Sequence, residues 1–362
     1  MTEPLLYSAE PVFTIDGSIK GELARDLVRL DVLESTEGLK TLVLRLAGTP
    51  AHPDVPDNPE IYLDGSTVDF GKKVEVALGP SGSARTVFRG YLSAIEAVYA
   101  ESQEPEVVLY AEDRLMELRM TRRFRTWEKM SDADIATQIA NEHGLTPQVN
   151  AGGPTYDVVQ QWNQSDLAFL RERALPIQAE VTLDDTTLHF ESRTARSGSE
   201  ITLVAGNQLL DVQVRADLAH QRTKVKVSGY DAQARDKIEE ESDGSAIQGE
   251  VQGGKTGPDV LQRAFGERVS HRVRDVPLVD AEATAWARAE MLRRARGFVT
   301  AAGTTNGTPD LVVGSKVNLD RVGAPFTGGG YYVTRVHHSY DREQGFRTRF
   351  EAERATVNDG GQ

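Results

Sequence analysis

Two pairs of segments near opposite ends of the chain share a residue pattern, and this repeat constrains the fold more than any other feature. Residues 70–78 (FGKKVEVAL) parallel residues 313–321 (VGSKVNLDR). Residues 91–99 (YLSAIEAVY) parallel residues 332–340 (YVTRVHHSY), which places Ile95 on Val336. The pattern therefore suggests that one structural unit occurs twice.

The spacing after these segments repeats as well. Tyr99 aligns with Tyr340, and each tyrosine is followed after 12 residues by an alanine and then a glutamate, namely Ala111–Glu112 and Ala352–Glu353. Any two β-hairpins look alike to some degree, so a chance likeness stays open. The equal spacing favours two similar β-domains in one chain. Three copies in a ring would then present six similar units, although the sequence itself does not reveal a trimer.

Alternation of apolar and polar residues supports β structure in both parts of the chain, because this period marks strands that bury one face. The expected strands are 27–34, 41–46, 73–78, 86–99 and 106–111, and later 209–218, 223–231, 316–322, 331–340 and 346–355. Short strands of this kind predict small antiparallel barrels or sandwiches.

A change of pattern at residue 126 predicts an α+β unit. Ser131 and Ser165 are good N-cap residues for two helices, and Gly144 is a natural end for the first. Residues 179–192 predict a hairpin that turns at Asp184–Asp185.

Residues 232–260 are acidic and rich in glycine, which predicts a long exposed loop that is partly disordered. A helix is expected over 280–297, capped by Asp280 and ended by Gly297. The expected fold is mainly β with an α+β insertion and two antiparallel β-barrels. The expected domains are a first barrel at 1–125, the insertion at 126–198, a second barrel at 199–231 and 297–355, a loop and helix at 232–296, and a disordered tail at 356–362.

Composition excludes several functional classes. The formal charge of −14 argues against a general nucleic-acid binder. The absence of cysteine excludes disulfides, thiol catalysis and cysteine-based metal sites. No membrane span or signal peptide is expected, so synthesis in the cytosol fits. A local run of arginines is expected to be solvated surface or a subunit contact: Arg114, Arg119, Arg122, Arg123 and Arg125.

Candidate chemical motifs do not assemble into a site. Residues 249–256 (GEVQGGKT) match the phosphate-loop pattern, but the preceding segment is too polar for a core strand, and Gly257–Pro258 is expected to disrupt the helix start. His337 and His338 should face opposite sides of a strand, so they should not share a metal. We therefore assign no catalytic, cofactor-binding or metal-binding residue and expect no enzyme and no cofactor.

The run QQWNQSD (160–166) could be a ligand site or a strand that enters a capped helix. We expect the second, with Trp162 packed at the junction and its indole N–H bonded to a partner. Ser165–Asp166 would cap the helix.

The chain resembles the hub proteins of contractile phage tails and related injection machines: the late control D protein family and the N-terminal hub part of VgrG proteins. Residues 156–174 (YDVVQQWNQSDLAFLRERA) carry the likeness, supported by residues 130–145, 224–231 and 329–354. The resemblance implies two tube-protein-like barrels per subunit and a homotrimeric baseplate hub.

The resemblance further implies a structural adaptor that joins a sixfold inner tube to a threefold spike in a phage, tailocin or other injection particle. The expected partners are the tube protein, a separate trimeric spike and baseplate proteins, with DNA or an effector at most passing through the channel. No membrane binding is expected. A baseplate-associated peptidoglycan hydrolase and a nucleotide-dependent assembly factor using Gly249–Thr256 remain as alternatives.

Overall fold

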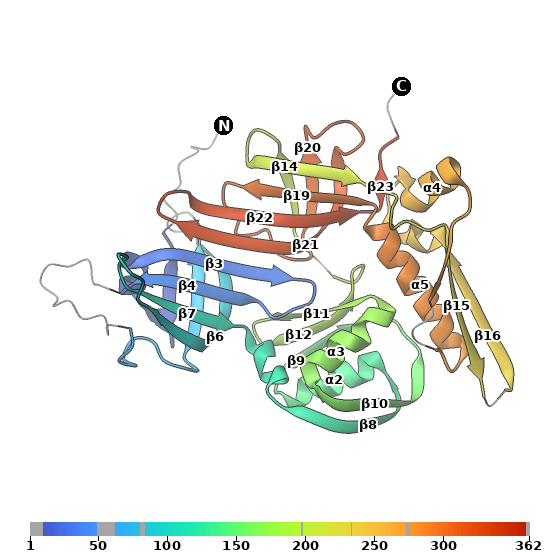
Figure 1. Ribbon diagram of the computed structural model, residues 1–362, viewed down its shortest axis with the longest axis horizontal. Coiled ribbons are helices and arrows are strands. Elements are labelled where there is room, and N and C mark those ends of the chain that lie inside the picture. Colours follow the sequence, from blue (N-terminus) through green and yellow to red (C-terminus); the bar gives the residue numbers. More distant parts are fainter. Residues whose placement is uncertain are drawn as a thin grey trace, which may run out of the picture.

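The computed structural model describes residues 10–48, 62–79, 84–196, 198–232, 234–272 and 276–359. Its largest element is a sheet of 13 strands drawn from both ends of the chain (Figure 1). The N-terminal half supplies β1 (Val12–Ile15), β2 (Ser18–Ile19), β3 (Leu27–Ser35), β4 (Thr41–Ala47), β5 (Lys73–Leu78), β6 (Arg85–Val98) and β7 (Glu106–Glu112), with helix α1 (Gly21–Arg25). The C-terminal half supplies β13 (Glu200–Val204), β14 (Leu209–Ala216), β19 (Val299–Thr305), β20 (Lys316–Asp320), β21 (Gly328–Asp341) and β22 (Gly345–Arg354).

The two halves have the same strand order, so the internal repeat is structural. The first half runs β3-β4-β7-β6-β5-β1, and the second runs β14-β19-β22-β21-β20-β13. Two features differ at the outer edge: β1 lies antiparallel to β5 whereas β13 lies parallel to β20, and β2 pairs with β1 without a described counterpart beside β13. The halves are therefore equivalent in topology but not identical at their outermost strands.

Register and irregularities also repeat. Leu92 faces Ala111 and Val333 faces Ala352, and in both pairs the register shifts immediately afterwards. This is the signature of a β-bulge at the same position of β6 and β21. The alignment of Ile95 with Val336 predicted from the sequence is therefore correct.

A second shared irregularity aligns β3 with β14. The pairing of β3 with β4 shifts between Leu27 and Arg29, and the pairing of β14 with β19 shifts between Leu209 and Asp211. Bulges are specific features that a strand does not acquire by chance at matching places. Together the two pairs of bulges fix the residue-by-residue correspondence of the halves.

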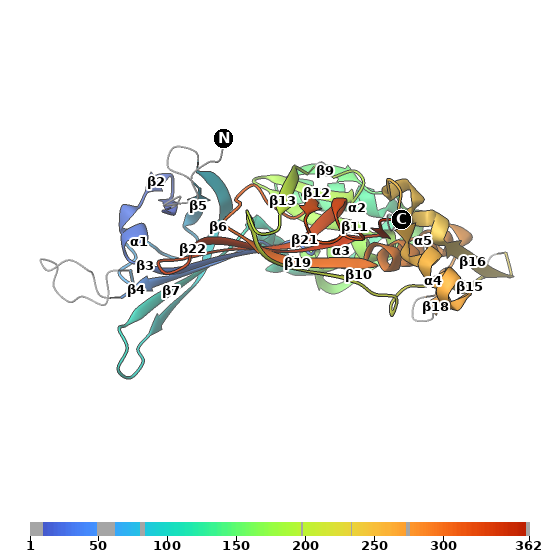
Figure 2. The same cartoon turned by 90° about the horizontal axis from the view of Figure 1, so that it is seen from above.

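Each half buries its own apolar core, but among the described strand pairings neither half closes into a barrel. Leu30, Leu44 and Val76 belong to the first core, whereas Val317 and Phe350 belong to the second. Instead of closing two separate barrels, the halves join edge to edge where β21 pairs with β3. Figure 2 shows β3, β21, β22 and β19 edge on as one continuous layer. The mainly β fold with an α+β insertion is confirmed, and the barrel-like halves share a sheet.

The helices and the hairpin of the α+β unit follow the sequence prediction, but the unit begins before the predicted residue 126, because Leu115 and Leu118 already belong to its core. It contains β8 (Arg122–Ser131), α2 (Asp132–Glu142), β9 (Thr146–Asn150), β10 (Thr155–Ser165), α3 (Asp166–Ala174), β11 (Ala179–Asp184) and β12 (Thr187–Ser192), with short 3-10 turns η1 (Arg114–Arg119) and η2 (Leu175–Ile177). Ser131 and Asp134 form a complete capping box, and the Ser165 hydroxyl accepts from the Ala168 amide. These local signals were readable because capping needs only neighbouring residues.

The predicted loop at 232–260 is wrong. The segment forms β16 (Asp236–Asp243), η3 (Gly244–Glu250), β17 (Lys255–Thr256) and the start of α4 (Gly257–Phe265). β16 pairs with β15 (Lys224–Asp231), which also pairs with β18 (Val269–Arg272). β15 therefore belongs to a separate three-stranded sheet and not to the second barrel-like half.

A small core explains why this acidic segment folds. Val227 and Ile238 pack against Ala283 and Trp286 of α5 (Asp280–Arg296). Most other side chains of β16 are polar, so its sequence resembles that of a loop. Its one buried apolar residue, Ile238, packs against the core. The N-cap of α5 is Val279, so Asp280 is its first residue and not its cap; Gly297 ends the helix as expected.

The predicted tail at 356–362 is also structured at its start. Thr356–Val357 forms β23, which pairs with β17. Residues 360–362 lie outside the described residues, as do residues 1–9 of the predicted first barrel.

Ile238→Ala should lower the free energy of unfolding by about 2–5 kcal/mol, because it opens a cavity between β16 and α5. Lys237→Ala is the matched control, since the Lys237 side chain is 77% exposed, and it should change stability by less than about 0.5 kcal/mol. Urea denaturation of both variants makes the comparison. Equal stabilities would contradict the packed strand.

Candidate assembly surface

The junction between the halves is the first part of this surface. β21 and β3 pair antiparallel over seven facing positions, from Arg335 opposite Ser35 to Asp341 opposite Arg29. Figure 1 shows these two strands side by side in the middle of the sheet. Backbone pairing of this length fixes the register of the two halves, because a one-residue slip would exchange the buried and exposed faces.

Charged side chains bridge the junction on the polar face of the sheet. His337 Nε2 lies 2.8 Å from Asp31 Oδ1, and Arg29 Nη1 lies 3.5 Å from Asp341 Oδ2. Burial alone would raise the pKa of Asp31, but hydrogen bonds from His337 and Arg29 outweigh it and lower that pKa to about 2. The Asp31 carboxylate is therefore stabilised as the anion by groups on both sides of the junction.

Apolar side chains seal the opposite face of the junction. Leu30 and Val32 of β3 are 0% and 1% exposed. Phe346 and Tyr340 of the second half pack against the core of the first half. The two cores thus meet beneath the paired strands, which makes the halves one continuous body.

β21 uses a single edge for two partners. Its first residues pair with β20, and its residues from Arg335 onward pair with β3. The equivalent strand β6 pairs with β5 up to Tyr91 on that edge. Beyond the Leu92 backbone contacts to Gly71 and Lys72, that edge of β6 has no partner strand within the described residues. β14, the counterpart of β3, ends the sheet and pairs with β19 alone among the described ladders.

A hollow of about 610 Å³ lies on the polar face beside β14. Its charged lining carries both signs: Asp211, Arg335, His337, Arg349 and Glu351. Ala302 and Gly303 of β19 leave the space that these longer side chains surround. A lining of mixed sign gives no single preference for anions or cations.

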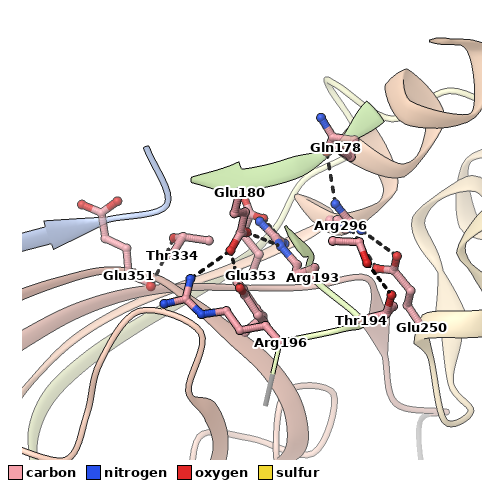
Figure 3. A network of polar contacts seen from close by, with 12 residues as sticks. Gln178, Glu180, Arg193, Thr194, Arg196, Glu250, Arg296, Thr334, Glu351 and Glu353 are labelled. Carbon is pink, nitrogen blue, oxygen red and sulfur yellow. Dashed lines mark hydrogen bonds and ion pairs between the residues drawn. The ribbon is translucent and has the colours of Figure 1, made fainter. Parts of the chain in front are cut away.

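A largely buried polar network, with some side chains partly exposed, connects the α+β unit to the second half (Figure 3). Glu180 of β11 accepts hydrogen bonds from Arg193, Arg196 and the Tyr332 hydroxyl. Arg193 Nη1 also lies 2.9 Å from Glu353 Oε2 of β22. Burial would lower the pKa of the two arginines, but their acidic partners raise it, so both remain cations.

A neighbouring pair extends the network to the helical side. Arg296, at the end of α5, forms a 2.6 Å ion pair with Glu250 and donates to the Gln178 side chain. Figure 3 shows the Arg296 side chain between Gln178 and Glu250. Three segments distant in the sequence therefore meet through charged and polar contacts.

The predicted arginine run does not form an open basic patch. Four members are paired with acids: Arg114 with Glu117, Arg119 with Glu112, Arg123 with Asp166, and Arg125 with Glu142. Arg122 donates to the Asn163 carbonyl. The run consequently offers little free charge for binding phosphates.

Residues 249–256 pack against the C-terminal strand. Lys255 Nζ lies 3.1 Å from Asp359, and Lys255–Thr256 pairs with β23. α4 does begin at Gly257, with Thr256 as its N-cap. The expected disruption by Gly257–Pro258 is wrong, because proline is tolerated in the first turn, where its missing N–H has no helical partner.

The two adjacent histidines lie in different environments. His337 contacts Asp31 on the polar face, whereas the buried His338 contacts Thr348 Oγ1 at 2.9 Å. Burial lowers the pKa of His338 to about 3, so it is neutral at physiological pH. Over the described ranges, no three histidine or acidic side chains gather as metal ligands. Asp184–Asp185 lies at the hairpin turn, as expected.

The expected packing of Trp162 is wrong. Trp162 is 67% exposed beside Phe124, which is 76% exposed, and its indole N–H donates to Gln160. The buried residue is Gln161, whose amide donates to Asp166 Oδ1 and to the Gln164 carbonyl. Sequence reasoning missed Gln161, although the alternation from Val159 to Gln161 places both residues on the buried face.

Solved structures of tail proteins share this fold. The chain is similar to the 43 kDa tail protein of prophage MuSo2 from Shewanella oneidensis, with a TM-score of 0.68, 14% identity, and 96% of this chain and 99% of that chain covered. A tail protein from Neisseria meningitidis gives a TM-score of 0.67 and 13% identity, with 96% and 97% covered. At these identities the similarity establishes the fold and no more.

A third structure links the fold to secretion machinery. The Escherichia coli c3393 protein, a type VI secretion component described as similar to the T4 bacteriophage tail proteins gp27 and gp5, gives a TM-score of 0.54. It is 12% identical, with 92% of this chain and 74% of that chain covered.

Comparisons by sequence give one match. A family model described as the Alg8 N-terminal domain matches residues 63–342. Among curated proteins, none matches the chain. Within the described residues, no helix is long and apolar enough to cross a membrane.

Asp31→Asn should lower the free energy of unfolding at pH 7, because it removes the anion that Arg29 and His337 stabilise. A carboxyl with a lowered pKa stabilises the fold above its unfolded pKa of 3.8, and this stabilisation is lost as pH falls toward 2. Urea denaturation from pH 7 to pH 2 should show the deficit shrinking below pH 3.8. The exposed control Glu37→Gln should show no such trend; a deficit independent of pH would contradict the assignment.

Glu180→Ala should destabilise the protein by roughly 1.5–3 kcal/mol, because two largely buried arginines lose the anion to which both donate hydrogen bonds. Glu351→Ala is the control, since its side chain is 60% exposed and 3.9 Å from Arg335, and it should cost less than about 1 kcal/mol. Chemical denaturation and hydrogen exchange across β11 and β12 provide the readout. Similar costs for both variants would show that the network does not hold the joint.

Proposed function

The chain belongs to the family described as the Alg8 N-terminal domain, and we propose that it acts as the central structural hub of a phage tail, tailocin or phage-like contractile injection system. In this role it is a homotrimer that joins a sixfold inner tube to a threefold spike. Its work is structural and needs no chemical step.

The two equivalent halves carry this proposal. Each chain contributes the same strand order twice, with matching bulges, so three chains supply six similar units. A ring of six similar units matches a sixfold tube, while the ring itself repeats only three times. A chain with one such unit would give a threefold or sixfold ring, but not both symmetries at once.

The fold supports the setting of this role. The similar solved structures are a prophage tail protein, a second tail protein and a type VI secretion component. We infer that the partners are an inner-tube protein on one face, a separate trimeric spike on the other, and baseplate proteins around them. The protein would accordingly be part of the assembled particle, with cargo passing through the ring.

The mass of the full-length protein in solution tests the trimer. Native mass spectrometry and light scattering across a wide concentration range should detect a species of three 39.7 kDa chains. Electron microscopy of that species should show end-on rings with six similar lobes. Addition of the tube and spike proteins from the same particle should increase the trimer fraction, because they bind only the assembled ring.

Two results would overturn this function. The first is a protein that stays monomeric at every concentration and also with the tube and spike proteins present. The second is release of soluble fragments from purified peptidoglycan by the protein alone, which would indicate a hydrolase.

A further inference from the structure

The junction inside one chain specifies how neighbouring copies join. We propose that β14 of one copy pairs antiparallel with the free edge of β6 in the next copy, in the register that β3 and β21 use within a chain. This inference rests on the proposed ring and adds to it the strands and residue pairs that close it.

The correspondence of strands follows from the bulges. The shared bulge after Leu92 and Val333 places β6 on β21, and the shared bulge after Leu27 and Leu209 places β14 on β3. Within a chain, β21 of the second half holds β3 of the first half. By the same correspondence, β6 in the first half of one copy would pair with β14 in the second half of a neighbouring copy.

This correspondence gives the register without adjustable choices. Within the chain, His337 faces Leu33 and Ser339 faces Asp31. The equivalent facing pairs between copies are Glu96 with Arg215, Val98 with Gln213, and Tyr99 with Val212. The first of these pairs joins opposite charges on the polar face of the sheet.

Burial at equivalent positions differs as expected if a neighbour is missing. At the junction inside the chain, Leu30 and Val32 are fully buried. Their counterparts Val212 and Val214 are only half-buried, although both already touch the second core. Each therefore lacks part of the cover that its counterpart has.

Tyr99 shows the same difference from the other side. It is 65% exposed, whereas its counterpart Tyr340 is half-buried against the first core. In the proposed pairing the Tyr99 ring covers the half-buried valines of β14. Burial of apolar area of this kind stabilises association at about 25 cal/mol per Å².

Charge and shape agree with the same pairing. The Arg215 side chain is 69% exposed and pairs with Asp217 of its own chain, while Glu96 accepts from the Tyr110 hydroxyl. Both side chains therefore lie at the surface of the strands that would meet. Figure 2 shows the β6–β7 hairpin projecting from the body, where an adjacent strand could pair with it.

The geometry uses each edge once. An unpaired strand edge is a template for another strand, and a head-to-tail contact between different edges forms a closed ring or an open fibre. Because β6 and β14 are different strands, the contact is head-to-tail. In the proposed ring all three copies contribute both edges, so the sheet becomes continuous around the channel.

Disulfide trapping tests the register, and the chain is well suited because it has no cysteine. Val98→Cys combined with Gln213→Cys places two thiols at a predicted facing pair, where Cα atoms are about 4.5–5.5 Å apart. That separation lies within the range of about 4.4–6.8 Å that a disulfide accepts. Oxidation should convert most of the protein into a single covalent trimer on non-reducing gels.

The matched control is Ala94→Cys with Gln213→Cys. It uses the same strands, but the thiols lie four residues out of register, about 13 Å apart along the strand. This variant should give less than a tenth of the covalent trimer. Efficient trapping in the control, or a ladder of open polymers in place of the trimer band, would overturn the register.

Charge reversal gives an independent measurement. Glu96→Arg or Arg215→Glu alone should weaken the trimer at least tenfold by analytical ultracentrifugation, and the double variant should recover most of the loss. Failure of both trapping and recovery in a protein that is still trimeric would overturn this interface and leave the hub function standing. A wild-type protein that never forms trimers would overturn both.

Discussion

Pairing of β21 with β3 is the interaction on which the rest of the structure depends. Each half has its own apolar core, so the relative position of the halves is set where the two cores meet. The backbone ladder sets the register, and the Asp31–His337 contact adds a charged constraint above it. A junction made from the main chain is insensitive to most side-chain replacements, which suits a part whose geometry must be constant.

The second joint has a different physical basis. Glu180, Arg193 and Arg196 connect the α+β unit to the second half through largely buried ion pairs. Charges taken out of water contribute little net stability, but they strongly disfavour any other arrangement. The chain thus combines a backbone joint that sets register with an ionic joint that sets orientation.

Local signals in the sequence predicted more of this structure than long-range ones. Ser131, Ser165 and the alternating strands were readable because caps and strand faces depend on nearby residues. β16 was missed, since only Ile238 in it is buried and its other residues resemble a loop. Trp162 was misplaced because the neighbouring Gln161 occupies the buried side of β10.

The joining of the two β halves through one shared sheet was not predicted, for a related reason. Whether a sheet closes depends on which strand edges meet, and those edges can be far apart in the sequence. β21 pairs with both β20 and β3 along one edge, and the sequence of β21 alone does not indicate this. The repeat, by contrast, could be recognised in the sequence, because the two halves keep the same spacing between equivalent residues although most of the residues differ.

The halves differ in one respect that bears on how a partner docks. β1 runs antiparallel to β5, but β13 runs parallel to β20. Around a ring of three chains the six units would therefore alternate between two kinds of outer strand. A partner that contacts only the strands common to both halves would have six equivalent binding positions. A partner that contacts the outer strands would have three. In the proposed hub, the reversed outer strand would therefore give the spike three equivalent attachment positions, while the tube would have six equivalent rotational positions.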